Sequence, residues 1–166
     1  MELSSARHHL LEGIAIEHEG SFDPDVLVLD AGVMEGGATV DIPLQRARES
    51  FDINVFEHLQ LVQAIVPKMF ARGAGKVVWM SSMGGVLVAP LLGVYCATKH
   101  AIEALAGSTK VELEPFGVKA ATVNPGVFGT AFNDTGAESY VQWYDADKAG
   151  CRTSVIPWSV RLIRRK

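Results

Sequence analysis

Three short, mostly apolar runs, separated by two longer segments with helical periodicity, most constrain how this chain can fold. The runs span residues 26–29, 76–80 and 118–123. Each has the length of a strand, and the continuous apolar run at 26–29 is typical of a strand buried on both faces of a parallel sheet. Strand, helix, strand, helix, strand at this spacing predicts βαβ crossovers and therefore a parallel sheet.

The two intervening segments have the periodicity of amphipathic helices. From 44 to 70, apolar residues recur at steps of three and four, namely Phe51, Val55, Phe56, Leu59, Val62, Ile65, Val66 and Met69. Pro67 falls in the last turns of this segment, so we expect the helix to kink there or to end soon after. A second helix is predicted from 94 to 113, and Pro115 and Gly117 close it.

Composition and charge exclude several classes of protein. The chain has 166 residues, of which 48% are hydrophobic, so it is too apolar to be disordered and long enough for one domain. No apolar stretch approaches the roughly 18 residues of a membrane span, and the N-terminus lacks the apolar run of a signal peptide. A net charge of −4 argues against general nucleic-acid binding. The two cysteines form no disulfide framework, so we expect a cytoplasmic protein.

Tyr95 and Lys99 are the most chemically informative pair in the sequence. They lie four residues apart on the helix predicted at 94–113, so their side chains share one face. Lowering the pKa of a phenol from about 10 by about two to three units takes roughly 3–4 kcal/mol. We expect the Lys99 ammonium, together with a second positive group in a water-poor site, to lower the pKa of Tyr95 in this way and make it a general acid/base. Ser82 follows the strand at 76–80, at the edge where open α/β sheets bind ligands, and its hydroxyl can donate to a substrate carbonyl.

Five motifs, in order, resemble the short-chain dehydrogenases/reductases over about residues 25–133. They are Ala31-Gly32, Phe51-Asp52-Ile53-Asn54-Val55, Met80-Ser81-Ser82, Tyr95-Cys96-Ala97-Thr98-Lys99 and Asn124-Pro125-Gly126. The resemblance implies an α/β fold, namely a partial Rossmann-like, doubly wound parallel sheet in three α/β/α layers, with its N-terminal strands truncated. Residues 25–133 would form the catalytic half. An N-terminal remnant (1–24) would precede it, and a lid and C-terminal segment (134–166) would follow.

The resemblance also implies a reaction, the reversible transfer of hydride between NAD or NADP and a carbonyl or alcohol. Tyr95 matches the catalytic acid/base, Lys99 the residue that holds the nicotinamide ribose, and Ser82 the hydroxyl that orients the substrate. Asn54 matches the residue that anchors a water in the proton relay. The implied cofactor contacts are Ala31, Gly32, Tyr95, Lys99, Pro125, Gly126, Val127 and Thr130, and the implied substrate contacts are Ser82, Met83, Tyr95 and Phe128.

The sequence departs from the family pattern in two places. Leu29-Asp30 stands where the family usually has two asparagines, and a carboxylate cannot donate as an amide does. The family opens with a strand and a Gly-rich turn that holds pyrophosphate, and nothing before Asp25 matches it. Residues 32–37 imitate the spacing of that turn but align better with the later Ala-Gly motif. Two alternatives follow, a working oxidoreductase or a catalytically inactive remnant that acts as a dimerisation or interaction module.

Three further features bear on substrate, metal and partners. Residues 127–150 hold five aromatic side chains and predict a loop-rich flap with an aromatic inner face, which as a lid favours an apolar or ring-bearing substrate. Cys96 and His100 lack a second pair of zinc ligands, so we expect helix packing and no metal. The apolar stripes of helices 44–70 and 94–114 exceed what one face of a sheet needs. The resemblance implies that these helices pack across a two-fold axis, so we expect a homodimer or homotetramer. We expect no nucleic-acid or membrane partner.

Overall fold

The computed structural model describes residues 23–129, 131–145 and 148–150. Its main elements are β1 (Val26–Leu29), α2 (Leu44–Phe51), a π-helical turn (Asp52–Phe56), α3 (Glu57–Arg72), β2 (Gly75–Met80), α4 (Gly93–Leu113), β3 (Val118–Val123) and α5 (Ala131–Trp143). The three predicted strands and the two predicted helical segments are confirmed. Predictions that concern residues 1–22, Thr130 and residues 151–166 lie outside the described residues.

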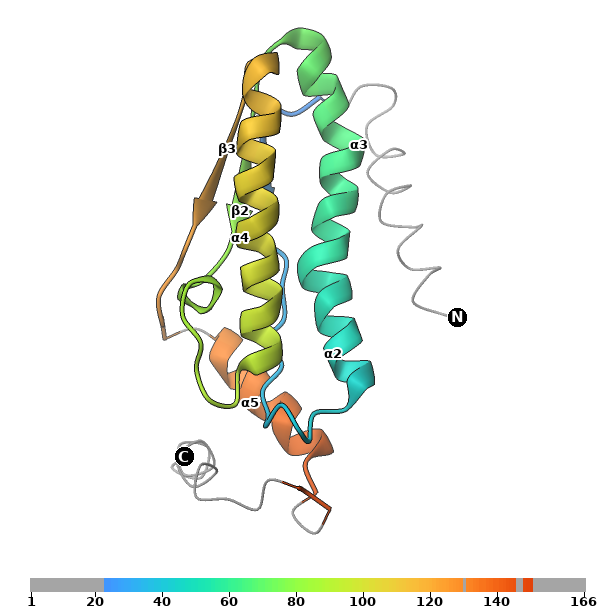
Figure 1. Ribbon diagram of the computed structural model, residues 1–166, viewed down its shortest axis with the longest axis vertical. Helices are drawn as coiled ribbons and strands as arrows, with labels where there is room; N and C mark the ends of the chain where they lie inside the picture. Colours follow the sequence, from blue (N-terminus) through green and yellow to red (C-terminus); the bar gives the residue numbers. More distant parts are fainter. Residues whose placement is uncertain (1–22, 130, 146–147, 151–166) are drawn as a thin grey trace.

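The strands form one parallel sheet in the order β1-β2-β3, with β2 in the centre (Figure 1). Leu29 at the end of β1 pairs with Trp79, which in turn pairs with Thr122 on β3. The carboxyl ends of the strands are therefore level, and the loops that follow them meet at one edge of the sheet. This arrangement confirms the partial Rossmann-like fold and sets where a site can form.

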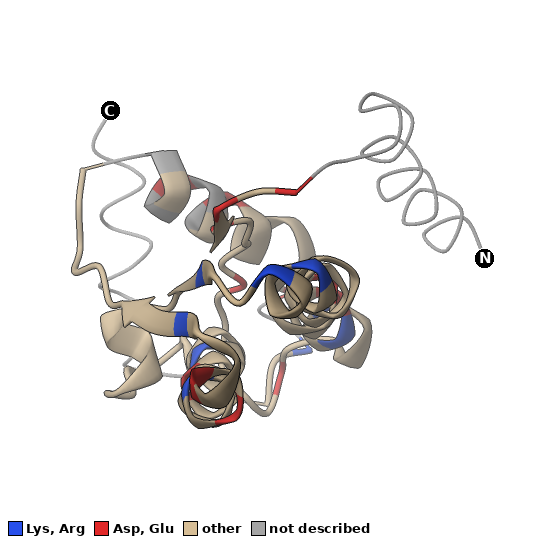
Figure 2. Cartoon of the chain, turned by 90° about the horizontal axis from the view of Figure 1, so that it is seen from above, with Lys and Arg blue, Asp and Glu red and all other residues tan. Residues whose placement is uncertain are grey.

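A single hydrophobic core lies between the sheet and the helices α3 and α4. Figure 2, which views the molecule from above, shows both helices end-on, on the same side of the strands. The buried core residues are Leu27, Leu29, Val77, Trp79, Val118 and Ala120 from the strands, and Ile65, Val66, Met69, Ile102, Ala106 and Leu113 from the helices. Full burial of a large apolar side chain contributes about 1.5–3 kcal/mol, so this layer holds the described elements together.

The expectation that β1 is buried on both faces is wrong for the described structure. Leu27 and Leu29 face the core, whereas Val26 and Val28 on the opposite face are 45% and 53% exposed. A continuous apolar run has no alternation between polar and apolar residues, so it cannot reveal how many faces of a strand are covered.

The helix predicted at 44–70 is one continuous rod made of α2, the π-helical turn and α3. It runs past Pro67 to Arg72, and Gly73 ends it in the left-handed conformation, with φ 70°. The π-helical turn, a geometry that is rare and frequent at functional sites, buries the Asn54 side chain. The sequence pattern predicted the rod and not this local change of winding.

The predicted loop-rich flap at 127–150 is wrong over α5, which is a helix of 13 residues. Phe132, Gly136 and Tyr140 recur every four residues and share one face of it, and Tyr144 follows directly after its end. Gly136 carries no side chain, so the apolar periodicity of the helix is interrupted in the sequence. The helix backbone contacts Met34 at this position, since a Cβ on Gly136 would lie 2.4 Å from the Met34 Cε atom. The aromatic character of the segment is confirmed by the buried Tyr140 and its contacts with Trp143 and Tyr144.

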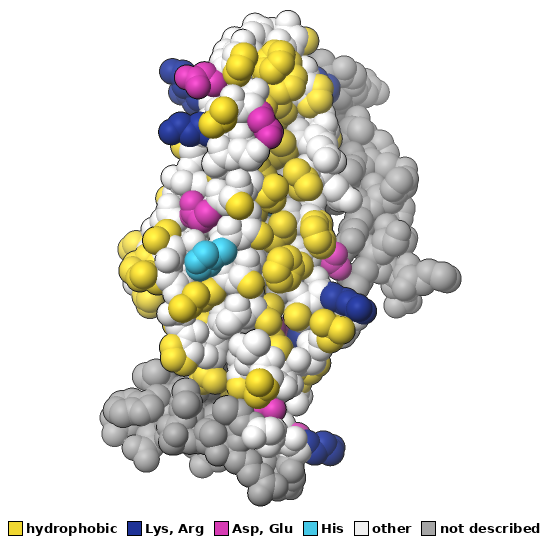
Figure 3. Space-filling model, viewed as in Figure 1, with side chains coloured by type: hydrophobic (Ala, Val, Ile, Leu, Met, Phe, Trp, Pro, Cys, Tyr) yellow, Lys and Arg dark blue, Asp and Glu magenta, His cyan; other side chains and the backbone are white. Residues whose placement is uncertain are grey.

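Hydrophobic side chains also gather on the outer surface of the helical layer. Figure 3 shows them in a column along α3 and α4. Phe56, Val111 and Phe116 are 50%, 70% and 50% exposed. Among the helices of the described residues, none combines the length and the apolar character needed to cross a membrane.

Candidate active site

Side chains from three elements meet at the carboxyl edge of the sheet. A Cβ atom built on Gly32, which follows β1, would lie 3.3 Å from Asn54 Oδ1 and 3.8 Å from Lys99 Nζ. The chain can therefore pass this close to both polar groups because residue 32 has no side chain. The four predicted catalytic residues, Asn54, Ser82, Tyr95 and Lys99, lie on the π-helical turn, the loop after β2 and helix α4.

Asn54 ties the loop after β1 to the helical layer. Its Oδ1 accepts a hydrogen bond from Val33 N at 2.7 Å, and its Nδ2 donates to Val33 O at 2.9 Å and to Thr98 Oγ1 at 3.0 Å. The side chain is fully buried and both of its N–H donors are engaged. The role of Asn54 in anchoring a water stays a prediction, while its role in holding Val33 is visible in the geometry.

Thr98 is a site residue that sequence reasoning missed. Its hydroxyl accepts from Asn54 and donates to the carbonyl of Tyr95 at 2.7 Å. It is fully buried and links the loop after β1, through Asn54, to the turn of α4 that carries Tyr95. The sequence did offer a signal for Thr98, because it is a threonine in the interior of a predicted helix, next to a predicted catalytic lysine. Hydroxyls in such positions commonly donate to a carbonyl three or four residues earlier.

Lys99 is buried, with 4% of its surface exposed. Its Nζ donates to the carbonyl of Met80, at the end of β2, at 2.8 Å, and lies 5.9 Å from the centroid of the Tyr95 ring. Burial lowers the pKa of Lys99, while the negative charge of Asp30 raises it. Asp30, which replaces one of the expected asparagines, therefore acts on the site through its charge.

The expected lowering of the Tyr95 pKa by Lys99 is wrong for the folded chain by itself. Burial raises the pKa of the Tyr95 phenol above 10.0, and interaction with the Ser82 hydroxyl opposes this rise. The ring is 8% exposed, and the Lys99 ammonium bonds the Met80 carbonyl. Loss of water around the phenol is therefore the largest influence on the pKa of Tyr95, and it disfavours the phenolate.

The loops after β2 and β3 lie against each other beside Tyr95. Met83 N donates to Pro125 O at 3.1 Å, and Asn124 Nδ2 donates to Ser82 O at 3.2 Å. Ser82 Oγ accepts from Gly84 N at 3.0 Å, and a Cβ on Gly84 would lie 3.2 Å from the Tyr95 ring and 3.5 Å from Ser82 Oγ. These contacts bring the predicted substrate and cofactor segments together.

The outer part of the predicted site is more open. Gly126 lies next to Met83, since a Cβ on it would be 3.5 Å from the Met83 sulfur. Val127 and Phe128 are 91% and 64% exposed. Thr130, the last predicted cofactor contact, lies outside the described residues. Phe132 of α5 is one of the five aromatic residues of the predicted flap, and it packs on Tyr95 with the ring centroids 6.1 Å apart, a contact that the sequence did not predict.

His58 is a second buried group near Lys99 that the sequence did not reveal. It lies on α3, is 1% exposed, and packs edge-on against Trp79 with the ring centroids 6.4 Å apart. Burial lowers the pKa of its imidazole, and the positive charge of Lys99 lowers it further. Its position four residues after Asn54 was the available signal, because residues at this spacing share a helix face.

Within the part of the chain that the structure describes, no three His, Cys, Asp or Glu side chains are grouped so that they could hold a metal ion. His100 Nδ1 contacts the backbone carbonyl of Cys96 at 2.9 Å, as expected for packing along one helix. Cys96 itself is buried, with 2% of its surface exposed.

Comparisons with known proteins identify relatives of this chain. The family model of the short chain dehydrogenases matches residues 10–140. The chain is 38% identical over 108 residues to 17-beta-hydroxysteroid dehydrogenase type 1 of Homo sapiens, covering 65% of this chain and 33% of that protein. It is 35% identical over 109 residues to the NADPH-dependent 3-dehydrocapnine reductase of Ornithobacterium rhinotracheale, covering 63% of this chain and 38% of that protein.

A solved structure shows the same similarity in three dimensions. The crystal structure of a short-chain dehydrogenase from Streptomyces avermitilis superposes with a TM-score of 0.68 at 36% identity, covering 75% of this chain and 45% of that one. The match thus spans less than half the length of each of these relatives. Because the family model matches most of this chain, the chain belongs to the short-chain dehydrogenase family of oxidoreductases.

Proposed function

We propose that this chain carries the reacting centre of an oxidoreductase that transfers hydride between NAD or NADP and a carbonyl or alcohol substrate. The convergence of Asn54, Ser82, Tyr95 and Lys99 at the carboxyl edge of the sheet is the observation that carries the proposal. The names of the two relatives, a dehydrogenase and an NADPH-dependent reductase, are consistent with it.

In this proposal Tyr95 moves the proton. Its phenol donates a proton to the carbonyl oxygen during reduction and becomes a phenolate, and the phenolate accepts the proton of the alcohol during oxidation. Ser82, whose hydroxyl interacts with the phenol, orients the substrate oxygen. Lys99 supplies a buried positive charge 5.9 Å from the phenol ring. When bound, the nicotinamide supplies or accepts the hydride.

The described residues fit the nicotinamide-ribose end of such a cofactor. The Lys99 ammonium uses one N–H donor on the Met80 carbonyl, so two remain for ribose hydroxyls. Gly32, Pro125 and Gly126 offer backbone at the same edge, and Ala31 and Val127 flank them. The described residues show no Gly-rich turn that leads into a helix, since the chain runs without a helix from β1 to Leu44. They therefore fit the reacting end and not the pyrophosphate.

The substrate proposed for this site is apolar or ring-bearing. Phe132 packs on Tyr95, and Met83, which is 50% exposed, lies next to Ser82. Phe128, 64% exposed, extends the apolar character of this side. A carbonyl attached to a hydrophobic group would meet these side chains as its oxygen reaches the phenol.

The test is a Tyr95→Phe variant assayed for turnover and, by calorimetry, for binding of NAD and NADP. Loss of the proton-transferring group is expected to lower turnover by about 10²–10⁴-fold, with cofactor affinity unchanged. Tyr144→Phe is the matched control, because Tyr144 stacks on Tyr140 in α5 and is expected to leave turnover unchanged. Absence of cofactor binding at millimolar concentration would contradict the proposal.

One observation favours a second function, a dimerisation module without activity. Hydrophobic side chains line the outer face of α3 and α4 (Figure 3). Val111 of α4 is 70% exposed. A dimer in sedimentation experiments that persists unchanged in Tyr95→Phe, from a chain that binds neither cofactor, would support this alternative. A homodimer or homotetramer through the two helices is compatible with either function.

A further inference from the structure

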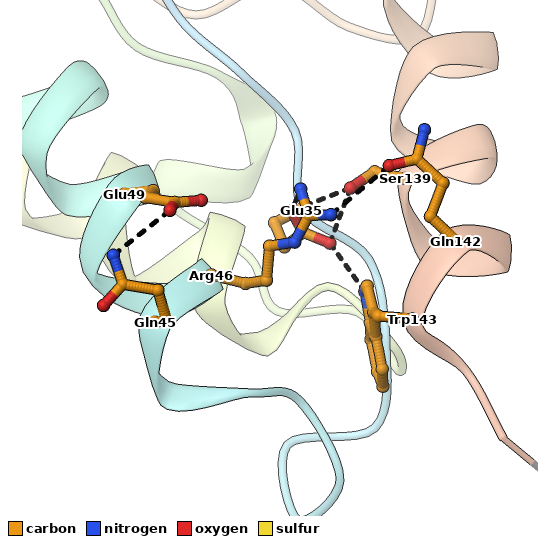
Figure 4. Close-up of polar contacts among 7 residues, drawn as sticks. All are labelled: Glu35, Gln45, Arg46, Glu49, Ser139, Gln142 and Trp143. Carbon is orange, nitrogen blue, oxygen red and sulfur yellow. Dashed lines mark hydrogen bonds and ion pairs between the residues drawn. The ribbon is translucent and has the colours of Figure 1, made fainter. Parts of the chain in front are cut away.

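A buried carboxylate in the loop after β1 makes a set of contacts that the proposed reaction does not use. Glu35 is 7% exposed. Ser139 Oγ lies 2.8 Å from each of its carboxylate oxygens, and Trp143 Nε1 donates to Oε1 at 2.8 Å. Figure 4 shows these side chains reaching from α5 to Glu35. Hydrogen bonds to a charged acceptor are among the stronger ones in proteins.

Helix α2 adds a positive charge to this group. Arg46 Nη1 lies 4.0 Å from Glu35 Oε2, and Arg46 Nη2 donates to Gln142 Oε1 at 3.3 Å (Figure 4). Arg46 thus touches both the carboxylate and α5. The loop after β1, α2 and α5 therefore meet at one buried carboxylate.

The backbone of the loop lies directly under α5. Gly37 has φ 144°, and a Cβ there would lie 2.3 Å from Trp143 Cζ2. A Cβ on Gly136 would lie 3.0 Å from the Met34 carbonyl oxygen. Gly37 in the loop and Gly136 in α5 thus allow the loop and the helix to approach so closely that any larger residue at either position would prevent the contact.

The same loop is tied firmly to the rest of the site. Gly37 N donates to Leu91 O at 2.7 Å, which joins the loop to the segment that leads into α4. Asn54 holds both the N–H and the carbonyl of Val33. Glu35 therefore projects from a segment anchored at both sides, and α5 is the element whose position depends on Glu35.

Helix α5 in turn carries Phe132 to Tyr95. Their ring centroids are 6.1 Å apart with an interplanar angle of 59°. Phe132 is 38% exposed, so it lies between the Tyr95 ring and solvent with part of its own surface open to water. The position of α5 thus decides how well Tyr95 is shielded from water.

We propose that Glu35 is a positioning residue that holds α5 on the loop after β1 and so keeps Phe132 packed against Tyr95. The proposal rests on the proposed function only in giving Tyr95 its role as the acid/base. Without the carboxylate, the Trp143 indole and the Ser139 hydroxyl lose their shared acceptor. Helix α5 then loosens, and water reaches the phenol.

The test is NMR of the whole chain without cofactor, with ¹⁵N-labelled tryptophan and ¹³Cζ-labelled tyrosine. Trp143→Phe and Tyr95→Phe assign the two signals. In Glu35→Ala the Trp143 indole N–H is expected to exchange with solvent at least about fivefold faster, equivalent to one hydrogen bond of about 1 kcal/mol. The Tyr95 pKa is expected to fall toward its ordinary value, because burial raises it in the wild type. Glu35→Gln keeps a carbonyl acceptor for the indole. Both changes, in the indole exchange and in the Tyr95 pKa, are therefore expected to be smaller in Glu35→Gln than in Glu35→Ala.

Glu49→Ala is the matched control. It removes the same charge from α2, where Glu49 pairs with Gln45 at 3.1 Å in an exposed position (Figure 4). It is expected to leave both signals unchanged. Phe132→Leu tests the last link, and should lower the Tyr95 pKa without changing the exchange of the Trp143 indole.

Two results would overturn the proposal: unchanged Trp143 and Tyr95 signals in Glu35→Ala, or equal changes in Glu35→Ala and Glu49→Ala. If Glu35→Ala does not fold, Ser139→Ala replaces it. This variant removes the Ser139 hydroxyl from α5 and leaves the Glu35 carboxylate paired with Trp143. It must then also speed the exchange of the Trp143 indole N–H and lower the pKa of Tyr95. All of these measurements are independent of turnover. A chain with the expected NMR response but no cofactor binding would refute the proposed function and leave the positioning role of Glu35 intact.

Discussion

Replacement of Asn54 tests whether the site depends on the hydrogen bonds that join the loop after β1 to the helical layer. Its amide makes three of them, to Val33 N, Val33 O and Thr98 Oγ1. Asn54→Ala removes all three and takes the partner away from the part-buried N–H and carbonyl of Val33. At a net value of about 0.5–1.5 kcal/mol each, we expect the free energy of unfolding to fall by about 1.5–4.5 kcal/mol.

Asn54→Asp separates the donor from the acceptor role at nearly constant volume. A carboxylate can still accept from Val33 N but cannot donate to Val33 O or to Thr98 Oγ1. The Thr98 hydroxyl already donates to the Tyr95 carbonyl at 2.7 Å, so it cannot turn to the carboxylate without breaking that bond. We therefore expect Asn54→Asp to lose about 1–3 kcal/mol, the net value of the two missing bonds.

Urea unfolding followed by circular dichroism measures the free energies, and hydrogen exchange at the Val33 amide reports the local bond. Val33 should lose protection in Asn54→Ala and keep it in Asn54→Asp. Ser108→Ala is the control, because its hydroxyl bonds Glu112 in an exposed position and should contribute less than about 0.5 kcal/mol. A loss below about 1 kcal/mol in Asn54→Ala, or equal Val33 exchange in both variants, would refute the reasoning.

Two further predictions use glycine and histidine positions. Gly37→Ala introduces a Cβ 2.3 Å from Trp143 at φ 144° and should lower the free energy of unfolding by about 1–3 kcal/mol in a thermal or urea unfolding experiment. Gly107→Ala lies in the exposed middle of α4 with open space around it, and in the same experiment it should raise the free energy of unfolding by about 0.5–1 kcal/mol. Because the pKa of His58 in the folded chain lies below 6.5, the unfolded chain takes up its proton first, and stability should fall as pH falls from 6.5 toward the folded pKa. His58→Leu should make the loss of stability between about pH 7 and pH 5 smaller, and an unchanged slope would contradict this.

The elements that bring Tyr95 and Lys99 to the sheet edge could be predicted from sequence, because periodicity and strand length are local properties. The same is true of Ser82 at the end of β2. Phe132 could not be placed, because its contact with Tyr95 depends on how α5 docks. The pKa of Tyr95 was predicted in the wrong direction for the same reason: the sequence supplies the cation, while the fold decides that its N–H points at Met80 and that water is excluded from the phenol.

The sequence by itself determined the order of the three strands and of the two helical segments between them, the family, and four of the residues that meet at the carboxyl edge, namely Asn54, Ser82, Tyr95 and Lys99. These follow from the periodicity within each element and from the motifs in their order along the chain, neither of which depends on how the elements pack. Only the tertiary structure decided that Asn54 holds Val33 from a π-helical turn, that Val26 and Val28 are exposed in the described part, and that α5 rests on Glu35. Glu35 and Trp143 are 108 residues apart. A contact across that separation exists because the packed core fixes both partners in space, and no local pattern encodes it.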